Sequence, residues 1–130
     1  MLSFINPFII VKTIANKGRG VFCNETIEAN TLIEIAPVIV LNEKDTATIH
    51  QTHLHDYYFS WGENQKQSAI ALGYVSMYNH AENSNCYYEA DFEKNTLKIF
   101  TKFNIQKGEE LTINYNMDSD SEKNLWFKVV

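Results

Sequence analysis

The sequence has little cysteine, proline or glycine, and it has no long hydrophobic run. Its 130 residues include two cysteines, two prolines and five glycines. Two cysteines are too few for a structural zinc site of their own, and without a secretory context we expect Cys23 and Cys86 to be free thiols. No segment approaches the ~20 consecutive apolar residues that a membrane-spanning helix needs, so we expect no insertion into a membrane.

Positive charge is also scarce, with 11 lysines and arginines against 16 aspartates and glutamates and a net charge of −5. Strong non-specific binding to nucleic acid depends on basic side chains, so we expect no direct nucleic-acid contact. An acidic surface suits a basic peptide or protein tail. Residues 2–11 are apolar, but no basic residue precedes them and they contain Asn6-Pro7, so we predict no signal peptide and a cytoplasmic or nuclear location.

Short segments rich in β-branched and aromatic residues, separated by turns, make up most of the chain. Pro37 favours an edge or a bend in one of them, and Glu93-Lys94-Asn95 predicts the turn of a hairpin. The predicted strand regions are residues 8–14, 21–23, 31–40, 86–103 (the hairpin) and 111–115.

Two further segments permit more than one structure. Asn42 is a suitable cap for a short helix, so residues 42–55 predict either that helix or an irregular insertion. Residues 68–77 predict either a strand or a short helix, because periodicity alone does not separate the two. A chain of this length suits one domain with one core, and we predict a single, mostly β domain.

Aromatic residues are abundant, with seven tyrosines, eight phenylalanines and two tryptophans. Most are expected in the core. A buried tyrosine hydroxyl needs a hydrogen-bond partner, whereas one that faces a channel is free to bind a substrate amine. The candidates for the wall of a narrow channel are Tyr57, Tyr58, Phe59, Tyr78 and Tyr115.

Two patterns suggest a dinucleotide site and a metal site, but the spacing of their residues fits neither. The Gly-Arg-Gly of residues 18–20 lacks the third glycine of a dinucleotide site, since Cys23 stands in its place, and a strand follows it rather than a helix. A local histidine cluster does not place its three rings on one helical face and has no cysteine nearby, so we predict no metal site. Its members are His50, His53 and His55.

The most informative segments are residues 78–85, Tyr-Asn-His-Ala-Glu-Asn-Ser-Asn, and residues 108–115, Gly-Glu-Glu-Leu-Thr-Ile-Asn-Tyr. Each alone would predict a polar turn. In this order they resemble the Asn-His-Ser-x-x-Pro-Asn and Gly-Glu-Glu-Leu-Thr-x-x-Tyr signatures of the SET-domain lysine methyltransferases. The chain departs from that pattern at Ala81, where serine is usual, at Ser84, where proline is usual, and at Asn114 and Asn116, which flank Tyr115 in place of aspartate and glycine.

The resemblance covers nearly the whole chain and implies a fold. That fold is a mostly β structure, the β-clip of several small curved sheets with short helices, and a C-terminal pseudoknot that brings Asn79 and His80 next to Tyr115. Residues 1–130 would form a single SET domain. The cysteine-rich, zinc-binding tail of many relatives is missing, so we expect Trp126 and its two neighbours to cover the adenine side of the cofactor instead.

The resemblance also implies a function, the transfer of a methyl group from S-adenosylmethionine to a lysine side chain of a protein substrate. Histones are the best-known targets of the family. The catalytic positions it implies are Tyr115 and Tyr57, and the wall of the lysine channel would be Tyr57, Tyr78 and Tyr115. The implied cofactor contacts are Lys17, Gly18, Arg19, Gly20, Asn79, His80, Tyr115 and Trp126.

Two alternatives remain open from the residues. One is a non-catalytic β-clip module that uses its groove only to bind a peptide. The other is a purely structural β protein whose tyrosines all lie in the core. The partner expected for the enzyme is a protein with a basic, lysine-containing tail, and a homodimer is compatible with the resemblance.

Overall fold

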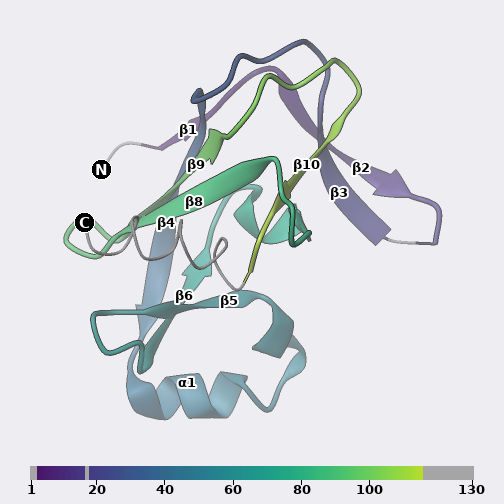
Figure 1. Ribbon diagram of the computed structural model, residues 1–130. Helices are drawn as coiled ribbons and strands as arrows, with labels where there is room; N and C mark the ends of the chain where they lie inside the picture. Colours follow the sequence, from purple (N-terminus) through teal and green to yellow (C-terminus); the bar gives the residue numbers. More distant parts are fainter. Residues whose placement is uncertain (1–2, 17, 116–130) are drawn as a thin grey trace.

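The computed structural model describes residues 3–16 and 18–115, which form two β-sheets and three short helices (Figure 1). The larger sheet has the strand order β5-β6-β4-β9-β8, and β1 pairs with β4 beside that path. All its described pairings are antiparallel. Its strands are β1 (Phe4–Ile5), β4 (Leu32–Leu41), β5 (Tyr58–Trp61), β6 (Gln67–Ala71), β8 (Cys86–Asp91) and β9 (Thr96–Thr101).

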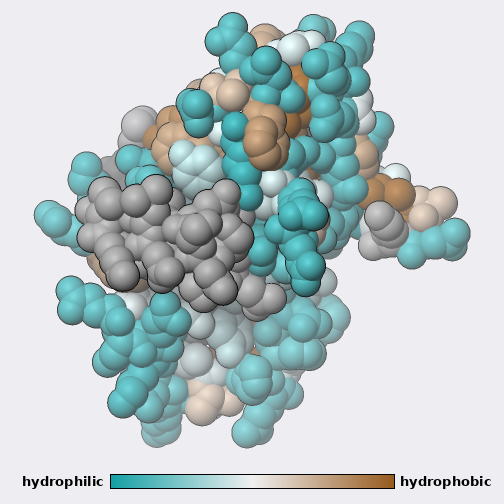
Figure 2. Space-filling model, viewed as in Figure 1, coloured by the Kyte–Doolittle hydropathy of each residue, from teal (hydrophilic) through white to brown (hydrophobic). Residues whose placement is uncertain are grey.

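The smaller sheet joins distant parts of the chain in the order β2-β3-β10-β7. Its strands are β2 (Ile9–Ile14), β3 (Gly18–Cys23), β7 (Asn79–His80) and β10 (Glu110–Ile113). The β2–β3 hairpin projects to one side of the molecule in Figure 1, and Figure 2 shows hydrophobic residues on the surface there. Phe8 and Ile10 are among the exposed hydrophobic side chains of this hairpin.

The helices are short and lie outside the sheets. They are α1 (Glu43–Ile49), η1 (His53–Asp56) and η2 (Val75–Met77). The side chain of Asn42 caps α1 by accepting from the Asp45 N–H at 2.8 Å. None of the residues in α1 is buried, and the Thr46 hydroxyl ties the helix to β6 by donating to the Ser68 hydroxyl at 2.7 Å.

The core lies between the sheets and takes side chains from both. Fully burying one aliphatic side chain contributes about 1.5–3 kcal/mol, so a set of this size supplies most of the drive to fold. The largest fully buried hydrophobic side chains are Val21, Ile33, Val75, Tyr78, Leu97, Ile99, Ile105, Leu111 and Ile113.

Most of the predicted elements are present. Strands occupy residues 9–14, 32–41 and 110–113, and residues 86–101 form the predicted antiparallel hairpin. The capped helix begins after Asn42 as expected. Residues 68–77 satisfy both alternatives, because β6 ends at Ala71 and η2 follows at Val75. The strand predicted for residues 21–23 begins earlier, since Gly18, Arg19 and Gly20 already pair with β2 as the start of β3.

Pro37 is the clearest departure from the expectations for the strands. It lies inside the ten-residue strand β4, which is central rather than at an edge. The missing N–H of proline costs little there, because β1 pairs with β4 up to Ile35 and β6 pairs with it only from Val38. The Pro37 carbonyl still accepts from the Leu72 N–H at 3.0 Å.

Among residues 3–16 and 18–115, no helix combines the length and the apolar character that crossing a membrane requires. The same residues contain no group of three or more metal-ligating side chains. Cys23 and Cys86 are both buried as free thiols.

Candidate active site

Strand β10 brings the two informative segments together (Figure 1). It runs antiparallel to β3, with Leu111 opposite Val21, and parallel to β7, with Ile113 opposite His80. The Ala81 N–H continues this pairing by donating to the Ile113 carbonyl at 3.0 Å. The implied neighbourhood of Asn79, His80 and Tyr115 is therefore confirmed.

Asn79 ties three strands to one another. Its side-chain amide donates to the Arg19 carbonyl of β3 at 3.2 Å and to Oε2 of Glu110 of β10 at 2.6 Å. Gly20 leaves room for this contact, since a Cβ there would lie 2.8 Å from Glu110 Oε2 and 3.0 Å from Asn79 Nδ2. Glycine at position 20 thus serves the close approach of polar side chains to the β3 backbone.

Asn85 holds the other side of β10. Its amide nitrogen donates to the Glu110 carbonyl at 2.9 Å, and its oxygen accepts from the Thr112 N–H at 2.9 Å. These are backbone groups that a neighbouring strand would otherwise bond, so the Asn85 side chain takes the place of such a strand. The loop between β7 and β8 is fixed to β10 as a result.

Tyr115 follows β10 and is held at both ends. Its N–H donates to Nδ1 of His80 at 2.9 Å, which requires that nitrogen to be unprotonated. Its hydroxyl donates to the Tyr78 carbonyl. The two rings of His80 and Tyr115 lie 5.2 Å apart between centroids. Tyr115 is nevertheless 41% exposed and lines a pocket.

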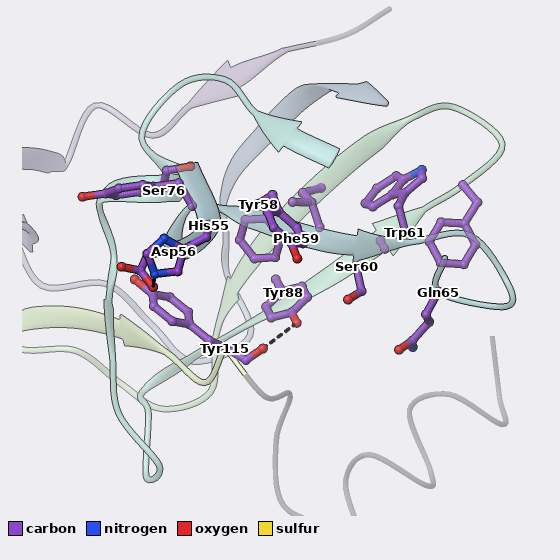
Figure 3. Close-up of a pocket in the computed structure, with 14 residues that line it drawn as sticks. His55, Asp56, Tyr58, Phe59, Ser60, Trp61, Gln65, Ser76, Tyr88 and Tyr115 are labelled. Carbon is purple, nitrogen blue, oxygen red and sulfur yellow. Dashed lines mark hydrogen bonds and ion pairs between the residues drawn. The ribbon is translucent and has the colours of Figure 1, made fainter. Parts of the chain in front are cut away.

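That pocket has a volume of about 580 Å³ and ends at Tyr115 (Figure 3). Strand β5 and the segment before it supply half of its lining residues, and the β8–β9 hairpin supplies four more. The lining residues are His55, Asp56, Tyr57, Tyr58, Phe59, Ser60, Trp61, Gln65, Ser76, Tyr88, Ala90, Phe92, Leu97 and Tyr115. None of these described lining residues is a lysine or an arginine, so the wall does not repel a cation.

Burial and neighbouring groups both act on the hydroxyl of Tyr115. Burial is the main cause of its raised pKa, and the electrostatic influence of the nearby Tyr57 and Asp56 side chains adds to it. At neutral pH the hydroxyl therefore stays protonated. It can donate a hydrogen bond and orient a reacting group, but it is a poor general base.

The predicted site residues are not all placed alike. Tyr57 and Tyr115 line the pocket, whereas Gly18, Arg19 and Gly20 lie on β3, next to Asn79 and Glu110. The predictions for Lys17 and Trp126 fall outside the described residues. The three histidines of the local cluster are exposed. His55 also lines the pocket, and its Nε2 lies 3.1 Å from Oδ1 of Asp56.

The expectation that the Tyr78 side chain walls the channel is wrong. That side chain is fully buried and does not line the pocket. Its hydroxyl points into the core and donates to Oε1 of Glu34 at 3.2 Å. A buried phenol needs such a partner, and what Tyr78 offers the site is its carbonyl oxygen.

Several residues of the site escaped the sequence analysis. Tyr88, Trp61 and Phe92 line the pocket, because β5 and the β8–β9 hairpin are brought together there, and no local pattern reveals that approach. The sequence did contain a signal for Glu34, because it is a single carboxylate within a run of hydrophobic residues. Burial raises its pKa from 4.5 to about 7, against the lowering effect of the hydrogen bonds from the Tyr74 N–H and the Tyr78 hydroxyl.

Comparisons with known proteins agree with this fold and site. A family model, the SET domain, matches residues 18–116. A Schizosaccharomyces pombe protein, the histone-lysine N-methyltransferase specific for H3 lysine-37, is 35% identical over 119 residues, which cover 91% of this chain and 76% of that protein. The Saccharomyces cerevisiae histone-lysine N-methyltransferase specific for H3 lysine-36 is 32% identical over 120 residues, but these cover 86% of this chain and only 16% of that protein.

Two solved structures are also similar. A Plasmodium falciparum protein described as a candidate histone methyltransferase superposes with a TM-score of 0.67 at 29% identity, covering 85% of this chain and 95% of that one. The Neurospora histone lysine methyltransferase DIM-5 has a TM-score of 0.65 at 17% identity and covers 82% of this chain and 51% of that one, a likeness that concerns the fold alone.

The curled sheets, the joined motifs and these relatives define the class of protein as a protein-lysine methyltransferase. Methyltransferases of this class generally use S-adenosylmethionine. The chain belongs to the SET-domain family. The two alternatives, a non-catalytic peptide-binding module and a purely structural protein, lose their support.

Proposed function

We propose that this chain methylates a lysine in the N-terminal tail of histone H3, with S-adenosylmethionine as the methyl donor. The observation that carries the proposal is the position of Tyr115, which is bonded to His80 and also ends the aromatic pocket. The matched signature residues and the pocket meet at this one side chain. The relatives named for H3 lysine-36 and lysine-37 support the choice of substrate.

The residues present fit the cofactor. Asn79 and His80 lie beside Gly18 to Gly20, and a Cβ at Gly18 would meet nothing within 4 Å, so the backbone there is open to a ligand. We assign cofactor binding to Gly18, Arg19, Gly20, Asn79, His80 and Tyr115. When bound, S-adenosylmethionine supplies an electrophilic methyl group on a positively charged sulfur.

The pocket suits the other reactant. A lysine amine attacks only when neutral, and removing its proton at pH 7 costs about 5 kcal/mol from a pKa near ~10.4. Tyr57, Phe59 and Tyr115 offer a partly apolar wall that disfavours the ammonium by desolvation. The acidic Asp56 at the same wall attracts the basic tail before the amine enters.

Tyr115 would then place the amine rather than deprotonate it. Its hydroxyl is fixed in direction by its hydrogen bond to the Tyr78 carbonyl, and Tyr115 itself lines the pocket. Holding reactants in a reactive geometry supplies several kcal/mol of barrier reduction. The Tyr115 hydroxyl oxygen would also be able to accept a weak C–H···O contact from the cofactor.

A methyl-transfer assay tests the proposal. Radiolabelled S-adenosylmethionine is incubated with the chain and with H3, with H3 in which lysine-36 or lysine-37 is replaced by arginine, and with an unrelated basic protein. We expect label on H3 and its loss in one arginine variant. Tyr115→Phe should reduce turnover by roughly 100-fold or more, while calorimetry finds the cofactor affinity within a few-fold of the original.

Tyr87→Phe is the matched control, since it removes a hydroxyl from a tyrosine that stacks on Phe100 and does not line the pocket. It should retain full turnover. Undiminished activity of Tyr115→Phe, or an absence of any labelled lysine together with no binding of S-adenosylmethionine, would contradict the proposal.

A further inference from the structure

Glu34 is a carboxylate in the hydrophobic core. It is fully buried on β4, opposite Ile5 of β1 and Ile99 of β9. Neither of these cross-strand neighbours carries a charge. Burying a carboxyl group among apolar side chains is costly unless it is hydrogen-bonded, so its contacts indicate what it stabilises.

Both carboxylate oxygens bind the segment that leads to the active site. Oε2 accepts from the Tyr74 N–H at 2.7 Å, and Oε1 accepts from the Tyr78 hydroxyl at 3.2 Å. The segment also closes tightly around the carboxylate at Gly73, where φ is 75° and an added Cβ would lie 2.4 Å from Oε2. Both ends of the stretch that contains η2 are thus fixed to one buried group.

The Tyr78 end of this stretch bears directly on Tyr115. The Tyr78 carbonyl accepts the Tyr115 hydroxyl, and two residues further on His80 accepts the Tyr115 N–H. The Tyr78 side chain enters the core while its carbonyl accepts the Tyr115 hydrogen bond. A movement of Tyr78 would therefore move the acceptor that orients the Tyr115 hydroxyl.

We propose that Glu34 is a positioning residue for methyl transfer, which acts by fixing Tyr78 and, through the Tyr78 carbonyl, the hydroxyl of Tyr115. The inference rests on the function proposed above, because that function assigns Tyr115 to the reaction. Errors of about 1 Å in the placement of reacting groups cost on the order of 100-fold in rate, so a contact two residues removed from the chemistry is sufficient.

The charge of Glu34 provides a readout that a merely structural role would lack. Its pKa of about 7 means that its ionisation changes near neutral pH. The titratable group that faces it is the Tyr78 phenol, and the Cys86 thiol acts on that phenol from β8. The ionised carboxylate accepts both hydrogen bonds, whereas protonation occupies one of its oxygens.

Two substitutions test the contacts. Tyr78→Phe removes the hydroxyl and keeps the buried ring, and we expect kcat to fall about tenfold while KM for the H3 substrate stays within twofold. Tyr74→Phe is the matched control, because its backbone N–H still reaches Glu34, and it should leave kcat unchanged. Glu34→Gln keeps an acceptor for Tyr74 and a donor for Tyr78, so it should remain active.

The pH profile of Glu34→Gln gives the second readout. The ratio of kcat for the original chain to kcat for Glu34→Gln should rise as the pH passes from 6 to 8, because only the carboxylate gains its second acceptor in that range. The rising fraction of neutral lysine affects both proteins equally and cancels. A constant ratio would count against the role of Glu34, and this comparison also serves if Tyr78→Phe does not fold.

A measurement without turnover separates this inference from the proposed function. NMR of the chain with 13C at Cζ of its tyrosines reports the hydroxyl environment of Tyr115, and Tyr115→Phe identifies that signal. The signal should shift in Tyr78→Phe and remain in place in Tyr74→Phe. An unshifted signal with unchanged kcat in folded Tyr78→Phe refutes the positioning role. Full activity of Tyr115→Phe refutes instead the function on which it rests.

Discussion

The buried carboxyl of Glu34 should make the stability of the protein depend on pH in an unusual direction. Burial raises its pKa from 4.5 to about 7 in the folded chain, while in the unfolded chain the group keeps its ordinary value. Between these values the folded protein binds more protons than the unfolded one. The free energy of unfolding therefore falls as the pH rises, whereas most carboxylates in folded proteins cause the opposite change.

The size of the effect follows from the two pKa values. One pKa unit corresponds to about 1.4 kcal/mol, so the step from 4.5 to about 7 amounts to about 3 kcal/mol. This contribution is fully present below pH ~4.5 and is lost by the time the pH exceeds ~7. A typical domain is stable by only 5–15 kcal/mol, which makes a loss of this size easy to measure.

Urea unfolding between pH 4.5 and 8, followed by tryptophan fluorescence, measures the free energy of unfolding. The same series on Glu34→Gln is the reference, because the amide does not titrate and the other carboxylates contribute equally to both proteins. We expect the original chain to lose about 3 kcal/mol relative to Glu34→Gln across this range. A difference that is constant with pH would falsify the reasoning that Glu34 is a desolvated carboxyl.

Two further substitutions probe the strands that form the site. Gly20→Ala would bring a Cβ to 2.8 Å from Glu110 Oε2 and 3.0 Å from Asn79 Nδ2, and the overpacking should cost about 1–3 kcal/mol of stability and weaken S-adenosylmethionine binding, measured by denaturation and calorimetry. Asn85→Ala removes two hydrogen bonds between the side chain and β10 and leaves the Thr112 N–H without its acceptor, so we expect a loss of about 2–3 kcal/mol in urea unfolding.

Asn85→Ala has a matched control at an exposed asparagine. Asn64→Ala removes an exposed contact, in which the Asn64 side chain accepts from the Lys66 N–H at 3.1 Å, and it should cost well under 1 kcal/mol. Equal losses in Asn64→Ala and Asn85→Ala would argue against a special role for the hydrogen bonds between Asn85 and β10. A Gly20→Ala protein of unchanged stability and cofactor affinity would show that the Glu110 and Asn79 side chains move aside freely.

Local patterns were sufficient for most strands because their signal is local. The alternation in residues 97–101 and the turn at Glu93-Lys94-Asn95 predict the β8–β9 hairpin, and the structure contains it. The edge position predicted from Pro37 was wrong, because a proline is excluded from a central strand only where its N–H is needed. Whether it is needed depends on where β1 and β6 stop pairing with β4, which are distant in sequence.

The residues of the candidate site were likewise predictable only in part. The order of residues 78–85 and 108–115 was enough to name Asn79, His80 and Tyr115, and the structure joins them through β10. The roles of these residues in binding and catalysis stay predictions. The prediction that the Tyr78 side chain faces the channel was wrong. The direction of this side chain depends on the buried carboxylate that accepts a hydrogen bond from its hydroxyl.

The sequence by itself determined the class of fold, the succession of strands and turns, and the identity of the residues that meet at β10, since composition and short motifs are properties of neighbouring residues. Only the tertiary structure decided which tyrosines face a pocket and which face the core. Burial depends on how sheets close over one another, and Tyr115 and Tyr78 differ in this respect although both carry the same side chain. The link between the buried Glu34 and the Tyr115 hydroxyl likewise exists only once residues 37 to 44 positions apart are packed together, because hydrogen bonds form between groups that the fold brings within about 3 Å.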